Sequence, residues 1–185
     1  MRNRERGRAG AGLGLAEVGA AGPEALNWSI DNCTIQRALS VLGDRWTFVV
    51  LREVFNGIRR FDDMRVRTGI PRQVLSGRLA RCVAEGLLRR EPYREPNQRQ
   101  RAEYRLTQKG LDLYPILVAL NAWGTAHYAD ALGSPLEFRH RDCTGEVAVR
   151  LRCSEGHDVA DMRAVVPAPG PGARRRRATV QVSGP

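Results

Sequence analysis

The fold of this chain is decided by the stretch Gly69-Ile-Pro-Arg-Gln-Val-Leu-Ser-Gly-Arg-Leu-Ala-Arg-Cys-Val-Ala-Glu-Gly-Leu-Leu88. Apolar residues recur there at the spacing of one face of an α-helix, at Leu75, Leu79, Cys82 and Val83. Pro71 suits the first helical turn, where its missing N–H costs nothing, and Gly86 suits the end, where a positive φ is often needed. The spacing therefore predicts a helix over residues 71–86 that buries an aliphatic stripe.

The remaining faces of this predicted helix carry polar side chains, namely Arg72, Gln73, Ser76, Arg78 and Arg81. Arginine and glutamine can form bidentate hydrogen bonds with base edges in the major groove of DNA. The alternative is an ordinary surface helix whose arginines only aid solubility, and the helix alone does not separate the two interpretations.

The segments before this helix predict two longer helices, over 34–43 with Thr34 as N-cap and over 44–55. The second is apolar nearly all round, which is typical of a helix in a core. A third, short helix is predicted around Asp62–Arg65, followed by a turn at Thr68-Gly69. A short helix, a glycine-containing turn and a second helix with a polar face make a helix-turn-helix pattern.

The segment after the central helix predicts a β-hairpin, with strands at 87–91 and 102–106 and an arginine-rich tip between them. A hairpin directly after a helix-turn-helix is a winged helix. A further helix begins after Thr107, breaks at Pro115 and continues to about Ala131. One of its two apolar stripes (Leu111, Tyr114, Val118 and Ala122) has no cover in so small a domain, which predicts a homodimer.

The predicted fold class is thus mainly α with a small β-hairpin wing, a winged helix-turn-helix followed by a small C-terminal β appendix. Residues 1–26 are expected to be a disordered tail and residues 27–132 the DNA-binding and dimerisation domain. Residues 133–166 form the appendix, with a strand through Val147–Cys153, and residues 167–185 a disordered basic tail.

The composition points to an anionic partner. The 185 residues carry a net charge of +10, and a basic balance of this kind favours nucleic acid over a membrane surface. Nearly all of the cations are arginines, which a GC-rich genome also explains. No apolar run is long enough to span a membrane, and no secretory signal is recognisable. Four cysteines without such a signal do not predict a disulfide framework, so the expected compartment is the cytoplasm.

Several short motifs follow one another along the chain, namely Cys33-Thr-Ile-Gln-Arg-Ala-Leu39, Gly43-Asp-Arg-Trp-Thr47, Leu51-Arg-Glu53, Gly57-Ile-Arg-Arg-Phe61, Val74-Leu-Ser-Gly-Arg-Leu79, Glu85-Gly-Leu-Leu88, Glu103-Tyr-Arg-Leu-Thr-Gln-Lys-Gly110 and Ala122-Trp-Gly124. In this order they resemble the HxlR-type winged helix-turn-helix transcription regulators. The resemblance covers about residues 33–127. It implies a homodimer that binds operator DNA and responds to a small-molecule effector or to oxidants. The family often has serine where this chain has Pro71, which removes the usual N-cap side chain.

The chemistry of the side chains divides the expected DNA contacts into two groups. Arg72 and Gln73 are predicted at base edges, with Ser76 and Arg78 also facing the major groove. Phosphate contacts, which fix the register on the duplex without reading its sequence, are predicted for Arg59, Arg60, Arg81, Arg94, Arg99 and Arg101. The wing that presents the last three spans residues 92–102.

Two further hypotheses concern cysteine and histidine. Cys33, just before the first predicted helix, is a candidate redox sensor, because a helix N-terminus can lower a thiol pKa; nearby Asp31 opposes this, and the alternative is a half-buried structural cysteine. Thiolate and imidazole ligands suit tetrahedral zinc, so His140, Cys143, Cys153 and His157 are a candidate zinc site, the alternative being a hairpin with idle thiols.

The sequence contains no recognisable enzyme motif, so catalysis and a required cofactor are not expected. The leading hypothesis is a DNA-binding transcription regulator. The alternative is a zinc-dependent protein-interaction adaptor, built on a winged helix that no longer binds DNA.

Overall fold

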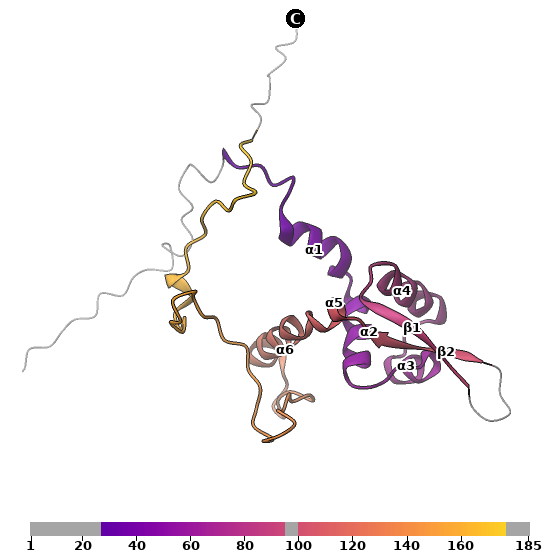
Figure 1. Cartoon of the computed structure of the whole chain (residues 1–185). Coiled ribbons are helices and arrows are strands. Elements are labelled where there is room, and N and C mark those ends of the chain that lie inside the picture. Colours follow the sequence, from indigo (N-terminus) through magenta and orange to yellow (C-terminus); the bar gives the residue numbers. More distant parts are fainter. Residues whose placement is uncertain (1–26, 95–99, 177–185) are drawn as a thin grey trace, which may run out of the picture. The chain divides into compact units, whose positions relative to one another are not determined.

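The structure is a computed structural model that describes residues 27–94 and 100–176. It divides into two units, residues 34–149 and the described parts of 1–33 and 150–185, and each is described by itself. The first unit contains the helices α1 (Thr34–Leu42), α2 (Arg45–Phe55), α3 (Phe61–Thr68), α4 (Arg72–Ala84), α5 (Gln108–Leu111) and α6 (Tyr114–Tyr128), and the strands β1 (Leu88–Tyr93) and β2 (Arg101–Leu106) (Figure 1).

The core of this unit lies between α2, α3 and α4, of which the sequence predicted α2 and the stripe of α4 to be buried. Leu51 of α2, Met64 of α3, and Leu75 and Leu79 of α4 are almost completely buried, and Leu88 at the start of β1 joins them. The aliphatic stripe of α4 is therefore buried in the core, as its spacing predicted. Burying each of these side chains contributes about 1.5–3 kcal/mol relative to leaving it in water.

A buried carboxylate fixes the position of α3 on α2. Glu53 of α2 has no solvent exposure, and its Oε1 accepts a hydrogen bond from Arg52 Nε at 2.9 Å. Its Oε2 accepts from Arg67 Nε, at the end of α3, at 2.6 Å. Gly69 follows with φ of 66°, so the chain can turn sharply between α3 and α4. The buried ion pair and this turn together set the helix-turn-helix geometry.

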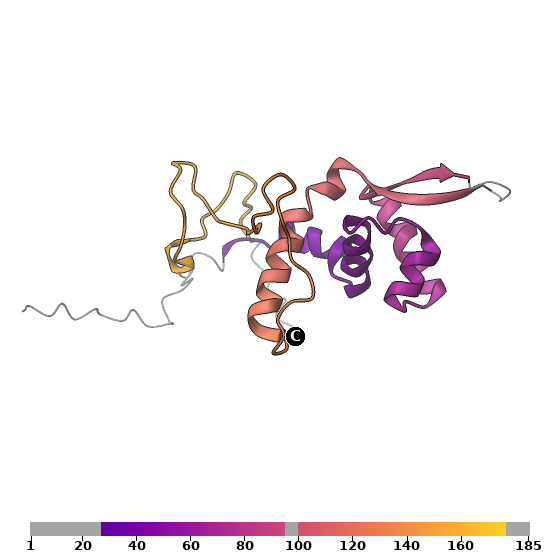
Figure 2. The same ribbon diagram turned by 90° about the horizontal axis from the view of Figure 1, so that it is seen from below.

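The β1–β2 hairpin is antiparallel, with Leu88 opposite Leu106 and Tyr93 opposite Arg101. Figures 1 and 2 both show it extending beyond α3 and α4. Like charges lie directly opposite one another along it: Arg89 faces Arg105, and Glu91 faces Glu103. The opposite charges meet along the diagonal instead, with Arg105 Nε 2.7 Å from Glu91 Oε2.

The helix break predicted at Pro115 is confirmed, whereas the last helix ends at Tyr128 and not at the predicted Ala131. Thr107 caps α5, its hydroxyl accepting from the Gly110 N–H at 3.1 Å. The chain breaks at Asp112–Leu113, Pro115 lies in the first turn of α6, and α6 ends at Tyr128. Thr34 is the first residue of α1, not a cap outside it.

The prediction that the stripe Leu111, Tyr114, Val118 and Ala122 lacks cover was wrong at Val118, whereas Leu111, Tyr114 and Ala122 are exposed. Val118, predicted to need a partner chain, is buried beside Leu117 and Phe138 of the same chain. The reason is that the chain returns along α6 after its end: Asn121 Nδ2 donates to the Leu136 carbonyl at 3.3 Å. The face left exposed carries Ile116, Leu120 and Trp123, with exposed fractions of 47%, 46% and 55%.

The strand predicted at Val147–Cys153 is absent from the described residues. The alternating pattern is split between two short partners: Val147 N–H donates to the Phe138 carbonyl in one unit, and the Leu151 carbonyl accepts from Val159 N–H in the other. Since Val147, Val149 and Leu151 also stay partly exposed, no apolar face organises a continuous strand. The second unit also pairs Trp28 with Arg175 and holds a short 3₁₀ turn, η3 (Met162–Ala164).

Candidate nucleic-acid interface

The outer face of α4 is built from small and polar side chains. Arg72, Gln73 and Ser76 are exposed, and Gly77 and Ala80 continue the same face. Because Leu75 and Leu79 hold the opposite face in the core, this surface is presented by a rigid support. Pro71 is the N-cap and makes no side-chain capping bond, so the substitution noted in the sequence has its expected structural effect.

Arg78 and Arg81 lie on a different side of α4 from Arg72, Gln73 and Ser76. Arg78 Nη2 is 3.2 Å from Asp44 Oδ2, the N-cap carboxylate of α2, and is half-buried there. Arg81 Nη2 donates to the carbonyl oxygen of Ser40 in α1. Both arginines therefore help to hold α4 against α1 and α2. For Arg78 this differs from the predicted position facing the groove, because an ion pair between distant segments cannot be read from helical periodicity.

Four arginines from four segments of the chain surround one polar cleft of about 600 Å³, beside the start of α4. Arg72 comes from α4, Arg60 precedes α3, and Arg90 and Arg101 come from the two strands of the wing. The cleft thus joins residues from both predicted parts of the interface. Positive charge gathered in a concave surface attracts a polyanion more strongly than the same charge spread over a convex one.

Aromatic rings and carboxylates hold these arginines in place. The Arg60 guanidinium lies 4.4 Å from the centre of the Tyr93 ring, and that of Arg72 lies 5.3 Å from the centre of the Phe61 ring. Arg101 Nη1 donates to Asp62 Oδ2 at 3.3 Å, which ties the wing to α3. The cleft is therefore a preformed site, and its lining also includes the carboxylates of Asp62 and Asp63.

The remaining predicted phosphate contacts are only partly described. Arg59 and Arg94 are exposed, and the Arg59 carbonyl accepts from the Tyr104 N–H at 2.8 Å, which adds residues 59–60 to the edge of β2. Arg99 lies outside the described residues.

The sequence prediction missed Arg90, Tyr93 and Asp62 as parts of the cleft. The signal was present in the hairpin, because the register places Arg90 opposite Tyr104 and Tyr93 opposite Arg101.

The cysteines differ in their surroundings. Burial raises the pKa of the Cys82 thiol to about 11, even though Arg78 and Arg81 act to lower it, so this thiol is inert core packing as predicted. Cys33 is a half-buried free thiol whose N–H donates to the Ile30 carbonyl at 3.0 Å. Its role as a redox sensor stays a prediction, which a Cys33→Ser variant tested for response to oxidants would check.

The predicted zinc ligands form two pairs, each at the turn of a small hairpin. His140 Nδ1 is 3.3 Å from Cys143 Sγ in one unit, and Cys153 Sγ is 3.6 Å from His157 Nδ1 in the other. Across residues 27–94 and 100–176, no cluster of three or more histidine, cysteine or acidic side chains could hold a metal ion. The four-ligand site stays a prediction, and elemental analysis of protein purified without a histidine tag would check it.

Comparison with known proteins identifies the family. Residues 41–131 match the model of the HxlR-like helix-turn-helix family. An HTH-type transcriptional regulator of Mycobacterium tuberculosis is 40% identical over 146 residues, which is 79% of this chain and 91% of that relative. A second one, from the cyanobacterium Synechocystis, is 33% identical over 94 residues, 50% of this chain and 68% of that relative.

Two solved structures share the fold. PA1607, described as a transcription factor, aligns with a TM-score of 0.64 and 31% identity over 74% of this chain and 95% of its own. PA1374 of Pseudomonas aeruginosa, likewise described as a transcription factor, aligns with a TM-score of 0.52 and 32% identity over 77% and 95%. Among the described residues, none of the helices is both long and apolar enough to cross a membrane. With its winged helix, its basic cleft and these relatives, the chain belongs to the HxlR-like helix-turn-helix family of transcription regulators.

Proposed function

We propose that this protein regulates transcription by binding operator DNA in the cytoplasm as a homodimer. The observation that carries the proposal is the continuity between the outer face of α4 and the arginine cleft under the wing. Arg72 belongs to both, so a duplex whose major groove receives α4 would bring a phosphate backbone to Arg60, Arg90 and Arg101. Base edges would then be read by Arg72 and Gln73, and the wing would fix the register.

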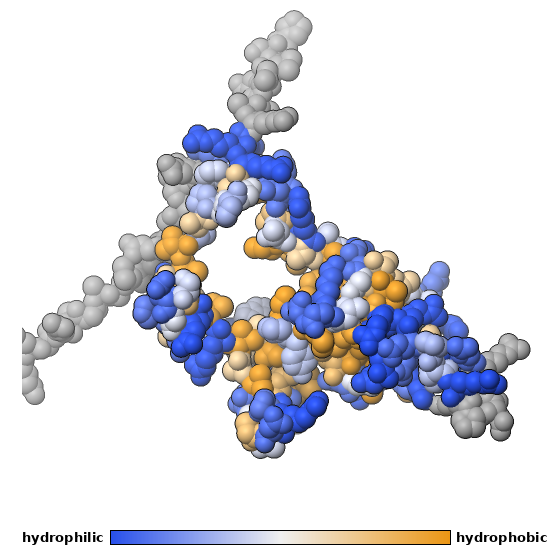
Figure 3. Space-filling model, in the orientation of Figure 1, coloured by the Kyte–Doolittle hydropathy of each residue, from blue (hydrophilic) through white to orange (hydrophobic). Residues whose placement is uncertain are grey.

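The homodimer is supported by apolar surface that the chain leaves open. Ile116, Leu120 and Trp123 on α6 are exposed, and so are Ile35 and Leu39 on α1. Figure 3 shows hydrophobic surface over α6, whereas the end of the unit with α3 and the wing is mainly hydrophilic. Contiguous apolar surface of this kind marks an interface. A two-fold dimer would present two copies of α4 to half-sites about one helical turn apart on the DNA.

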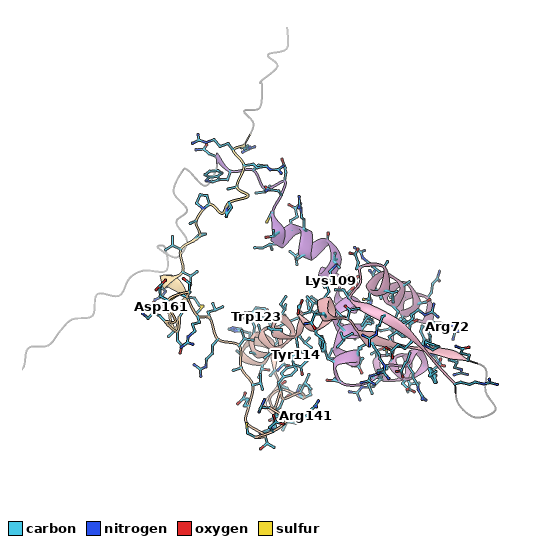
Figure 4. All side chains as sticks on the ribbon, in the orientation of Figure 1. Arg72, Lys109, Tyr114, Trp123, Arg141 and Asp161 are labelled. Carbon is cyan, nitrogen blue, oxygen red and sulfur yellow. The ribbon has the colours of Figure 1, made fainter. Side chains whose placement is uncertain are left out.

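The test is DNA binding by the full chain, measured by fluorescence anisotropy on its own upstream region and on random duplex. Arg72→Ala is expected to cost about 1–3 kcal/mol on the specific site and much less on random DNA, because only the former uses its base contact. Arg141→Ala is the matched control, since the exposed Arg141 lies outside the cleft and its substitution removes the same charge (Figure 4).

Equal losses on both DNAs would show that Arg72 contacts phosphate only. No binding to either DNA at low salt, where counterion release favours association most, would reject the proposed function itself. The zinc-dependent adaptor has no observation in its favour among the contacts or the relatives.

A further inference from the structure

A second, chemically different cavity lies in the same unit, between α2, α6 and the segment 134–138 that returns along α6. Its volume is about 320 Å³, and its lining is largely apolar, from Phe48, Val49, Leu117, Leu120, Leu136 and Phe138. This volume is at the lower end of the range for small-molecule sites, and such sites combine apolar walls with a few fixed polar groups. The cavity is thus sized for a ligand of one or two rings or a short acyl chain.

One ionisable side chain, Arg52, is found among the described residues that line the cavity. Arg52 and Arg67 share the single carboxylate of Glu53, with Arg52 Nε at 2.9 Å from one oxygen and Arg67 Nε at 2.6 Å from the other. Two guanidinium groups with one carboxylate leave a net positive charge beside the apolar wall. Since Glu53 is fully buried and the Arg52 side chain is 42% exposed, an arriving ligand meets the cation first.

The walls of the cavity are held by fixed contacts. Asn121 Nδ2 donates to the Leu136 carbonyl at 3.3 Å, and the Ser134 hydroxyl donates to the same carbonyl at 2.8 Å. Phe138 is buried against Leu117 and Val118. On the α6 side the wall includes Gly124, where an added Cβ would meet nothing within 4 Å. The cavity therefore reaches the helix backbone at Gly124, and a larger side chain there would occupy it.

We propose that this cavity binds a small organic anion with an apolar body, such as an aromatic monocarboxylate, whose carboxylate pairs with Arg52. Charge complementarity selects an anion, and the apolar walls select its body. Arg52 is joined through Glu53 to Arg67 near the end of α3, directly before the turn into α4. A ligand carboxylate competes with Glu53 for Arg52, so binding would change the partners of the carboxylate whose other oxygen accepts from Arg67 of α3. This coupling to DNA rests on the proposed function, whereas the binding site does not.

The experiment is calorimetric titration of the full chain with 2-naphthoate and with its neutral analogue 2-naphthylmethanol. Naphthoate is expected to bind at least about tenfold more tightly than the alcohol, the effect of one charge-assisted hydrogen-bonded pair. Arg52→Gln should abolish this preference, and Gly124→Leu should remove binding of both probes by filling the cavity. Arg45→Gln, an exposed arginine of the same helix outside the cavity, is the matched control and should bind as the unmodified chain does.

Equal affinity for the two probes, or unchanged naphthoate binding in Gly124→Leu, would overturn the proposal. An absence of naphthoate binding would also overturn it. DNA affinity measured with and without naphthoate then separates the two proposals. If the unliganded protein binds no DNA, the proposed function fails while the calorimetric result stands; if it binds DNA but no naphthoate, the reverse holds.

Discussion

Helices α4 and α6 differ in how far their apolar side chains are buried. The stripe of α4 is almost entirely buried in its own chain, at Leu75, Leu79 and Cys82, and the outer face is small and polar. Helix α6 buries Leu117 and Val118 and leaves Leu120 and Trp123 in solvent. The difference separates two kinds of recognition: the outer face of α4 suits a hydrated polyanion, while that of α6 suits another apolar surface, which is what we propose for the second subunit.

The largest effect is expected for a substitution in the buried stripe of α4. Leu79→Ala removes a fully buried side chain from the core and leaves a cavity, so we expect unfolding free energy to fall by about 2–5 kcal/mol. Leu120→Ala removes the same atoms from an exposed position. Urea unfolding at matched protein concentrations measures both. A comparable loss for Leu120→Ala would mean that most of its stabilising contacts come from a partner chain.

The next effect concerns the exposed side of α6. Leu120→Glu places a charge on the face proposed to meet the second subunit, where it would be buried without a partner. We expect dimer dissociation constants to rise about a hundredfold or more in analytical ultracentrifugation, with the far-ultraviolet circular dichroism unchanged. Arg65→Gln, which lowers the net charge by the same one unit at an exposed position of α3, controls for net charge. A monomeric unmodified protein at micromolar concentration would refute the dimer.

A third measurement uses the cysteine on the buried stripe of α4. The pKa of Cys82 is raised from 9.0 to about 11, so at pH 8 it is almost entirely the neutral thiol and lacks the reactive thiolate. With iodoacetamide and mass spectrometry, we expect Cys82 to be modified about a hundredfold more slowly than the exposed Cys143 and Cys153. The difference should narrow as the pH rises toward 11 and vanish in guanidinium chloride. Equal rates at pH 8 would show that the α4 stripe opens readily.

The smallest effect is expected in the arginine cleft beside the start of α4. Asp62→Asn removes the carboxylate that occupies Arg101 in the cleft, at the modest strength typical of an exposed ion pair. We expect DNA affinity to increase by about twofold to fivefold on specific and random duplexes alike. Asp112→Asn, which removes the same charge outside the cleft, is the control. An equal gain in both variants would mean that net charge, not the Arg101 pair, sets the effect.

The helices, the turn and the wing could be predicted from the sequence because their signals are local. The α4 stripe shows in the spacing of Leu75 and Leu79, and the Thr107 cap and the break at Pro115 follow from backbone chemistry. The errors share one cause, which is contact between distant segments. Val118 is covered because Phe138 returns to α6, and Arg78 turns aside because Asp44 lies next to it. The spacing of residues along a helix identifies neither Phe138 nor Asp44 as a partner.

The charge pattern of the β1–β2 hairpin has a consequence for how the wing finds its alignment. In the observed register arginine faces arginine and glutamate faces glutamate. Sliding one strand by two residues would keep every side chain on its face and would set Arg89 opposite Glu103 and Glu91 opposite Arg101. The observed register satisfies these charges only along the diagonal and within each strand, so charge pairing does not distinguish it from the shifted one, and docking of Leu88 and Leu106 on the core selects it. The wing should accordingly acquire its final alignment late in folding, after the helices have assembled.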